Sequence, residues 1–332
     1  MADPAQTRLF GVAEGYYQTK ALLGLWRLGF LDAAIRDEKV DVDGFAAEHG
    51  LDPALLRSLV GYLTVREYLE PVDGAVRLTE LGRASIPYFG YLPMLVGAYE
   101  PIFAGLEDVL TGAKVYGENL RRAEHELVGG LSAMEEHLLA RLTELTAGID
   151  VHGVLDLGCG SAQMLSKVLQ RFPHARGVGV DWEEAACAEA RRRLSAEGLA
   201  GRSTVLAGDV SRLDALPPHA LDEVDLVLAM FVMHEIYRQR DRAGVVACLS
   251  GIAEVIGPAG RLLMVEVSRI EPDRPRPGLR FVPEYQLVHD YSRQRLATQA
   301  EWQDMLAEAG LTVLRTEPAG MCEAFCFVAG RP

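Results

Sequence analysis

The chain has 332 residues, of which 49% are hydrophobic and 24% are charged, which is the balance of a globular protein long enough for two domains. Its formal net charge of −14 opposes binding to the phosphates of nucleic acids. The sequence contains no apolar run of about eighteen residues, which is the length that would predict a membrane span. The first residues lack the basic and apolar regions of a signal peptide. The five scattered cysteines predict no disulfide framework, so we expect a cytoplasmic protein.

The first part of the chain, residues 1–85, is predicted to be a small, mainly helical domain. Amphipathic stretches at residues 16–28 and 55–63 indicate helices, and the sequence YLEPVDGAVRLT at residues 68–79 predicts a short hairpin. Helices followed by a two-stranded wing are typical of a winged helix. Acidic residues outnumber basic ones here, which disfavours DNA as its partner.

Residues 86–150 are predicted to form a bridging segment. Its first half is rich in aromatic residues, which could line a pocket or pack in an interface, and its second half has a helical pattern. These aromatic residues are Tyr88, Phe89, Tyr91, Tyr99 and Phe103.

Residues 151–332 alternate between strand and helix patterns. The strands are expected at residues 154–157, 177–180, 205–209, 224–233 and 261–267, and each is followed by a turn or a helical stretch. A helix from Thr298 to about Gly310 and a hairpin of residues 311–317 and 324–329 complete the chain. This order predicts an α/β domain with a mostly parallel sheet and a ligand site at the carboxyl edge of its strands.

A glycine turn closes the first of these strands. In VLDLGCG, Gly158 and Gly160 permit a tight turn onto a helix, and Asp181 ends the next strand about twenty residues later, where an acid can accept ribose hydroxyls. Gln163 stands where the third glycine of a dinucleotide motif would be.

This turn resembles motif I of the class I S-adenosylmethionine-dependent methyltransferases. The resemblance implies a Rossmann-like domain that binds S-adenosylmethionine, with Asp181 at the ribose and Asp209 at the adenine. The residues expected to contact the cofactor are Asp156, Gly158, Gly160, Asp181, Trp182, Asp209, Val210, Met230 and Phe231.

The first domain resembles the dimerisation domain of plant-type and polyketide-type O-methyltransferases. The segments LGFLDAA, FAAEHGLDPALLRSLVGYL and VRLTELG follow in the order found in that family. The resemblance implies a homodimer joined through the first domain. The sequence adds a reason of its own, because the amphipathic helix around Leu22–Leu28 has more apolar surface than a domain of this size needs for itself, and we expect this surface to be exposed to a partner. The resemblance also implies that the bridging segment lines a substrate pocket, where we expect Tyr99 and Arg121.

Two histidines follow strands at the edge where the cofactor is expected. His234 comes after the fourth strand beside Glu235, and His289 comes after the fifth strand and a proline-rich lid, residues 268–280, beside Asp290. Two imidazoles from adjacent loops could hold a metal ion and leave room for a substrate. The neighbouring acids could be ligands, orienting groups or the base, and the sequence does not choose among these roles.

This pair resembles the site of the metal-dependent 2-oxo acid C-methyltransferases of nonribosomal peptide biosynthesis. The resemblance implies methylation at C3 of a small 2-oxo acid through an enolate chelated by iron or zinc, with His234 and His289 as metal ligands. Arg121, Arg122 and Arg280 are candidates for the substrate carboxylate.

Three other interpretations stay open. The first is a metal-free O-methyltransferase with His234 as general base, the second places His289 on the surface of a helix, and the third is a noncatalytic regulator that binds the cofactor.

Overall fold

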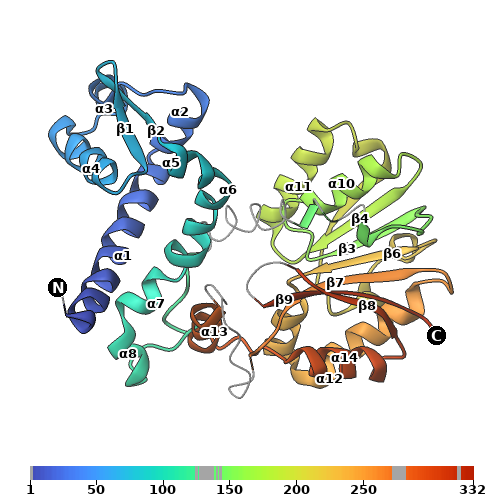
Figure 1. Cartoon of the computed structure of the whole chain (residues 1–332). Helices are drawn as coiled ribbons and strands as arrows, with labels where there is room; N and C mark the ends of the chain where they lie inside the picture. Colours follow the sequence, from blue (N-terminus) through green and yellow to red (C-terminus); the bar gives the residue numbers. More distant parts are fainter. Residues whose placement is uncertain are drawn as a thin grey trace. The chain divides into compact units, whose positions relative to one another are not determined.

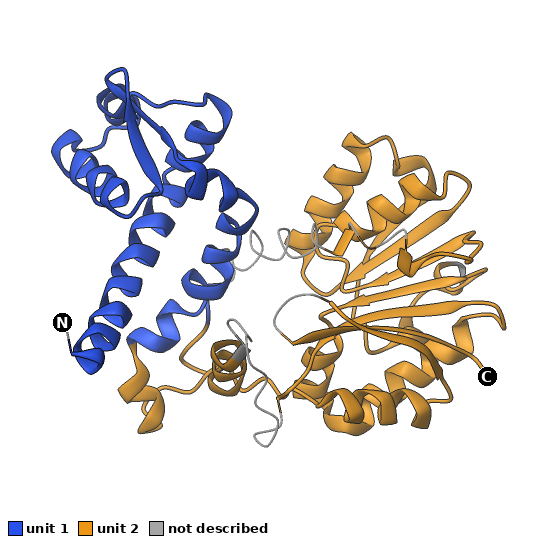
Figure 2. Cartoon of the chain, viewed as in Figure 1, with its two compact units in different colours: residues 1–104, 122–134 blue, residues 105–121, 135–332 orange. Residues whose placement is uncertain are grey.

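The computed structural model describes residues 3–123, 126, 138–139, 141, 144–270, 282–319 and 323–332. The chain divides into two compact units, Met1–Ala104 with Arg122–Met134, and Gly105–Arg121 with Glu135–Pro332 (Figure 2). The segment predicted as a bridge, residues 86–150, therefore contributes to both units. In the described part of the chain, no helix is long and apolar enough to cross a membrane.

Unit 1 is built from helices and one small antiparallel sheet (Figure 1). Its elements are α1 (Pro4–Arg27), α2 (Phe30–Arg36), α3 (Val42–Glu48), α4 (Pro53–Val65), β1 (Leu69–Val72), β2 (Ala75–Leu78), α5 (Glu80–Ala84), α6 (Ile86–Phe89), the π-helix η1 (Pro93–Gly97) and α7 (Glu100–Ala104). Asp3, Asp41 and Asp52 begin α1, α3 and α4 because their carboxylates accept first-turn amide hydrogens. The predicted hairpin is present as β1 and β2.

The apolar residues of α1 do not lie where we expected them. Leu22, Leu23 and Leu25 are buried inside unit 1, so the prediction of an exposed apolar surface around Leu22–Leu28 is wrong. The packing of this half of α1 against α2 and α4 explains the difference. The large exposed apolar side chains of α1 lie between its start and its middle instead, and they are Leu9, Phe10, Val12, Tyr16 and Tyr17.

Unit 2 contains a seven-stranded sheet with the order β5-β4-β3-β6-β7-β9-β8 (Figure 1). Its strands are β3 (Gly153–Leu157), β4 (Arg176–Asp181), β5 (Ser203–Ala207), β6 (Leu226–Met230), β7 (Arg261–Val267), β8 (Thr312–Pro318) and β9 (Ala324–Gly330). The first five strands pair in parallel, whereas β9 runs antiparallel to β7 and β8. This topology confirms the predicted fold class, a mainly helical region followed by a mostly parallel sheet with a C-terminal hairpin.

Unit 2 also contains several helices. They are α8 (Leu106–Leu110), α10 (Gln163–Arg171), α11 (Glu184–Ala196), α12 (Met233–Val255), α13 (Val282–Tyr291) and α14 (Gln299–Glu308), with short 3₁₀ turns η2 (Ala200–Arg202), η3 (Leu213–Ala215) and η4 (Pro218–Ala220). Apolar residues of β3, β6, β7 and β9 share a core with α12 and α14, which explains why these strands read as continuous apolar runs. Thr298 and Glu301 form the capping box that starts α14, as predicted.

The order of the strands decides where a ligand can bind. The chain leaves β3 toward β4 on one side and returns to β6 on the other, so β3 and β6 flank the point at which the direction of winding reverses. In open parallel sheets the loops beyond the carboxyl ends of such strands form the ligand site. The turn after β3 and the segment after β6 carry the glycines and His234.

Candidate active site

The turn after β3 has the backbone shape of a nucleotide-binding loop. Gly158 and Gly160 have φ angles of 71° and 51°, in the left-handed region that glycine adopts without strain. A Cβ atom on Gly158 would lie 2.9 Å from Cγ2 of Val232, so a side chain is excluded there. Helix α10 begins at Gln163, and the left-handed Ala162 precedes it.

Asp181 is joined directly to this turn. Its carboxylate accepts a hydrogen bond from the amide of Gly160 at 2.9 Å and another from the amide of Glu183 at 2.9 Å. These bonds fix a largely buried carboxylate at the carboxyl end of β4, next to the glycine turn. This is the arrangement expected of an acid that accepts ribose hydroxyls.

The other predicted cofactor residues differ in their surroundings. Asp156 is buried within β3, whereas the Trp182 side chain is 72% exposed after β4, where it is open to a ligand ring. Met230 and Phe231 are partly buried at the end of β6. Phe231 has a φ of 56°, which costs a residue with a Cβ atom conformational energy and marks a constrained bend just before His234.

Asp209 lies two residues beyond β5 beside Val210, which is partly buried. The Asp209 carboxylate accepts hydrogen bonds from the amide and hydroxyl of Ser211 and from Arg240 at 2.6 Å. Partial burial opposes ionisation of this carboxyl, but these hydrogen bonds and the charge of Arg240 hold its pKa below the ordinary value. An ionised acceptor is therefore present where the adenine is expected.

His234 is tied to a buried carboxylate that the sequence analysis missed. The residue lies in the first turn of α12, not directly after the strand, and its Nδ1 atom lies 2.8 Å from the carboxylate of Glu266. Glu266 is 0% exposed in β7 and also accepts the amide hydrogen of Met233 at 2.6 Å. The one signal for it in the sequence was a charged residue inside the apolar run RLLMVEV.

His289 is buried and not on the surface of a helix. It lies in α13 with 1% of its surface exposed, and its Nδ1 atom is 2.7 Å from the carbonyl oxygen of Tyr285. This placement excludes the interpretation of His289 as a surface residue. The rings of His234 and His289 have centroids 5.6 Å apart at an interplanar angle of 77°. The structure thus brings together two histidines that are far apart in the sequence.

Both imidazoles have the same hydrogen-bonding pattern. The carboxylate of Glu266 and the carbonyl of Tyr285 accept hydrogen bonds, so each Nδ1 atom must donate. Neutral rings with the proton on Nδ1 carry a lone pair on Nε2, which is the electron pair that binds a metal ion or takes a proton.

Glu235 connects α12 to the segment that follows α13. Its carboxylate accepts hydrogen bonds from Gln294 and from Arg238, the latter at 3.0 Å. Gln294 is buried, and its backbone N–H donates to the carbonyl of His289 at 2.8 Å. Glu235 therefore fastens the segment that carries His289 to the helix that carries His234. Gln294 is a second residue that the sequence analysis missed, because nothing in RQRLAT distinguishes it.

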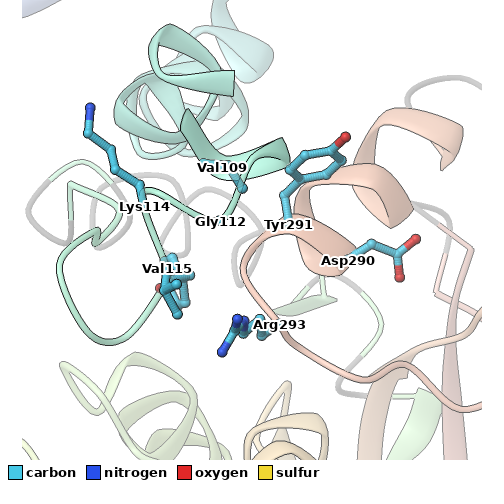
Figure 3. A pocket seen from close by; sticks show the side chains of 8 residues that line it. Val109, Gly112, Lys114, Val115, Asp290, Tyr291 and Arg293 are labelled. Carbon is cyan, nitrogen blue, oxygen red and sulfur yellow. The ribbon is translucent and has the colours of Figure 1, made fainter. Parts of the chain in front are cut away.

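The Asp290 side chain is paired with an arginine. Its carboxylate accepts a hydrogen bond from Arg269 at 3.1 Å and is about half exposed. It lines a surface cavity of about 240 Å³, in which Asp290 and Tyr291 lie on one side and Lys114 and Val115 on the other (Figure 3). The carboxylate that the structure places against His234 is therefore that of Glu266.

The predicted substrate contacts fall in different parts of the chain. Tyr99 is buried in unit 1, and Arg121 in unit 2 is exposed and donates a hydrogen bond to the carbonyl of Gly117 at 3.3 Å. Arg280 and most of the predicted lid lie outside the described residues. The roles of Tyr99 and Arg121 in substrate binding stay predictions.

The comparisons with known proteins agree with this fold. A family model described as a methyltransferase domain matches residues 154–260. The chain is 31% identical to the 2-ketoarginine methyltransferase of Streptomyces arginensis over 319 residues, which cover 92% of this chain and 87% of that protein. The chain therefore belongs to the class I S-adenosylmethionine-dependent methyltransferases.

Two solved structures show the same fold over the whole chain. One is mitomycin 7-O-methyltransferase, with a TM-score of 0.72, 18% identity, and coverage of 99% of this chain and 98% of that one. The other is human N-acetylserotonin methyltransferase in complex with S-adenosylmethionine, with a TM-score of 0.74, 19% identity, and coverage of 99% and 98%. The left-handed glycine turn and the carboxylate anchored to it fit this cofactor.

Proposed function

We propose that this enzyme transfers a methyl group from S-adenosylmethionine to C3 of a small 2-oxo acid, with a divalent iron or zinc ion at His234 and His289, in the biosynthesis of a secondary metabolite or peptide precursor. The observation that carries the proposal is the meeting of these two buried histidines, each with its Nδ1 atom committed to an oxygen acceptor. The similarity to a 2-ketoarginine methyltransferase supports a 2-oxo acid as the substrate class.

The donor set of the pair suits a borderline transition metal. Neutral imidazoles whose second nitrogen is held by a carboxylate or a carbonyl are the usual histidine ligands of such ions. Nitrogens bound to one ion at about 2.0–2.1 Å lie roughly 3–4 Å apart, a spacing compatible with ring centroids 5.6 Å apart. Two protein ligands leave positions for the carboxylate and keto oxygens of a substrate.

The chain's own residues prepare this site before any substrate arrives. Glu266 and the carbonyl of Tyr285 fix the imidazole tautomers, while Glu235 and Gln294 hold the two helical segments together. A divalent ion at the Nε2 atoms would polarise the keto oxygen and acidify the C3–H bonds. S-adenosylmethionine supplies the activated methyl group, and the glycine turn and Asp181 position it.

The same geometry supports a second candidate, a metal-free O-methyltransferase. A buried carboxylate that orients a histidine is the arrangement of a general base, and the pair of His234 and Glu266 provides it without His289. In that case His234 would remove the proton of a substrate hydroxyl. The two candidates therefore differ in what they require of His289.

One experiment separates them. We would measure metal content, methyl transfer to a panel of 2-oxo acids and phenols, and deuterium exchange at C3 by NMR, for the wild type, His289→Ala and the control His49→Gln in unit 1. The proposal expects bound metal in the wild type and in the control. His289→Ala should lose both the metal and the methyl-transfer activity. The wild type should exchange the C3 protons of a 2-oxo acid even when no methyl group is transferred. Retention of full activity by His289→Ala, with phenols as the methylated substrates, would establish the O-methyltransferase instead.

We also propose that the enzyme is a homodimer joined through unit 1. The support is the apolar surface on the first half of α1, where Leu9 and Val12 are each 70% exposed. Contiguous apolar surface of this kind is typical of a subunit interface.

A further inference from the structure

A cluster of histidines and acids lies at the edge of the sheet opposite the cofactor turn. His152 directly precedes β3 and His174 stands two residues before β4, so both lie at the amino ends of adjacent parallel strands. Asp150 lies two residues before His152, and Asp225 directly precedes β6. The methyl-transfer site is at the carboxyl ends of the same strands, so this cluster is separate from it.

The side chains of this cluster converge. The carboxylate oxygens of Asp150 lie 3.6 Å from Nε2 of His174 and 4.0 Å from Nε2 of His152. One ligand atom from each of these three residues lies within 4.8 Å of the others, and all three side chains are exposed. They form the one such three-residue group found among the described residues.

A fourth residue orients one of the imidazoles. Asp225 lies 3.5 Å from Nδ1 of His152, so this ring has a carboxylate at each of its nitrogens. The Asp225 carboxylate is itself anchored, because it accepts the amide hydrogens of His152 at 2.7 Å and of Gly153 at 3.2 Å. A carboxylate behind a histidine is the supporting contact of many metal-bound imidazoles.

Backbone hydrogen bonds hold the segment that carries His152. The amide of Arg176 donates to the carbonyl of His152 at 2.7 Å, and the amide of Asp225 donates to the carbonyl of Gly153 at 2.9 Å. These bonds extend the ladders between β3 and its two neighbours, so the central strands of the sheet position the backbone from which His152 projects.

We propose that Asp150, His152 and His174 form a surface site for a divalent transition metal such as Zn²⁺, with Asp225 as the residue that positions His152. Two imidazoles and one carboxylate are a donor set that Zn²⁺ accepts, and its remaining positions would be filled by water. Ligand atoms on one tetrahedral zinc ion lie about 3.3 Å apart. The three ligand atoms here lie within 4.8 Å of one another, so side-chain rotations that bring them closer by up to about 1.5 Å close the site. A bound ion would join the loops that precede β3 and β4, which gives it a stabilising role and no part in methyl transfer.

The test is a titration of the full-length, chelator-treated protein with zinc chloride, followed by calorimetry and by thermal unfolding. The variants are His174→Gln and Asp150→Asn, and the control is Asp222→Asn, which removes an exposed charge from the same edge of the sheet. His234→Ala is titrated in parallel, so that zinc bound at the proposed active site is counted separately. Circular dichroism and binding of S-adenosylhomocysteine confirm that each variant is folded.

The proposal expects one binding event that persists in Asp222→Asn and in His234→Ala but weakens at least tenfold in His174→Gln and in Asp150→Asn. Saturation of that event should raise the unfolding temperature of the wild type and of Asp222→Asn, and not that of the two ligand variants. Zinc binding that is unchanged in His174→Gln, or that weakens equally in Asp222→Asn, would overturn the site. Neither result bears on the proposed methyl-transfer site, which His234→Ala reports.

Discussion

Glu266→Gln tests the central contact of the candidate active site. The substitution keeps the volume of a side chain that is 0% exposed, and its amide oxygen can still accept the hydrogen bond from the amide of Met233. The amide nitrogen then faces Nδ1 of His234, which is 2.8 Å from the carboxylate in the wild type. Two donors cannot face each other, so Nδ1 must become an acceptor and the proton moves to Nε2.

The size of the effect depends on the role of His234. If His234 binds a metal ion, loss of the supporting carboxylate should lower metal affinity or activity about 10–100-fold. If His234 is the general base, the wrong tautomer should lower kcat by up to about 10⁴-fold, as in other carboxylate–histidine pairs. Binding of S-adenosylhomocysteine should be unchanged in both cases, because the glycine turn and Asp181 do not contact Glu266.

Glutamine is chosen over alanine because of stability. Alanine would leave the amide hydrogen of Met233 and the Nδ1 hydrogen of His234 buried without an acceptor, at a cost of about 1–3 kcal/mol each. A total of roughly 2–6 kcal/mol is a large part of the stability of an ordinary domain, which is about 5–15 kcal/mol. Such a variant could fail by unfolding and would say nothing about catalysis.

The assay combines steady-state methyl transfer, metal analysis and calorimetric titration with S-adenosylhomocysteine. The matched control is Glu254→Gln, which replaces an exposed glutamate elsewhere on α12. The control should behave as the wild type in all three measurements. If Glu266→Gln also keeps wild-type kcat and metal content, the tautomer argument is refuted. Any role of His234 in the reaction would then not depend on the Glu266 carboxylate.

Three further predictions concern the cofactor turn and the assembly. Asp181→Ala should weaken binding of S-adenosylhomocysteine in calorimetry by about 1.5–3 kcal/mol, because a charged acceptor is lost, and unchanged affinity would place the cofactor elsewhere. Gly158→Ala should lower the unfolding temperature more than Gly198→Ala, since both residues have a positive φ but a Cβ atom on Gly158 alone would meet Val232; equal losses would show that the contact does not matter. Light scattering should find a dimer for the wild type and a monomer for the double variant Leu9→Glu, Val12→Glu, and a wild-type monomer at micromolar concentration would contradict the proposed interface.

The sequence by itself determined the class of fold and the location of the cofactor turn. Alternating strand and helix patterns permit few arrangements other than a parallel sheet, and left-handed turns at Gly158 and Gly160 need residues without a Cβ atom. Asp181 was predictable for the same reason, since it ends the next strand at a spacing that the strand–helix–strand unit dictates. Local rules govern these features, so they can be read from short stretches of sequence.

Only the tertiary structure decided which side chains meet at the candidate active site. Glu266 and His234 are 32 residues apart and come together because β6 and β7 are neighbours in the sheet. His289 joins them from a helix whose burial its periodicity did not reveal, and Gln294 holds that helix to Glu235. Strand order and helix docking depend on the packing of the whole core. The spacing between residues along the chain does not reveal that packing.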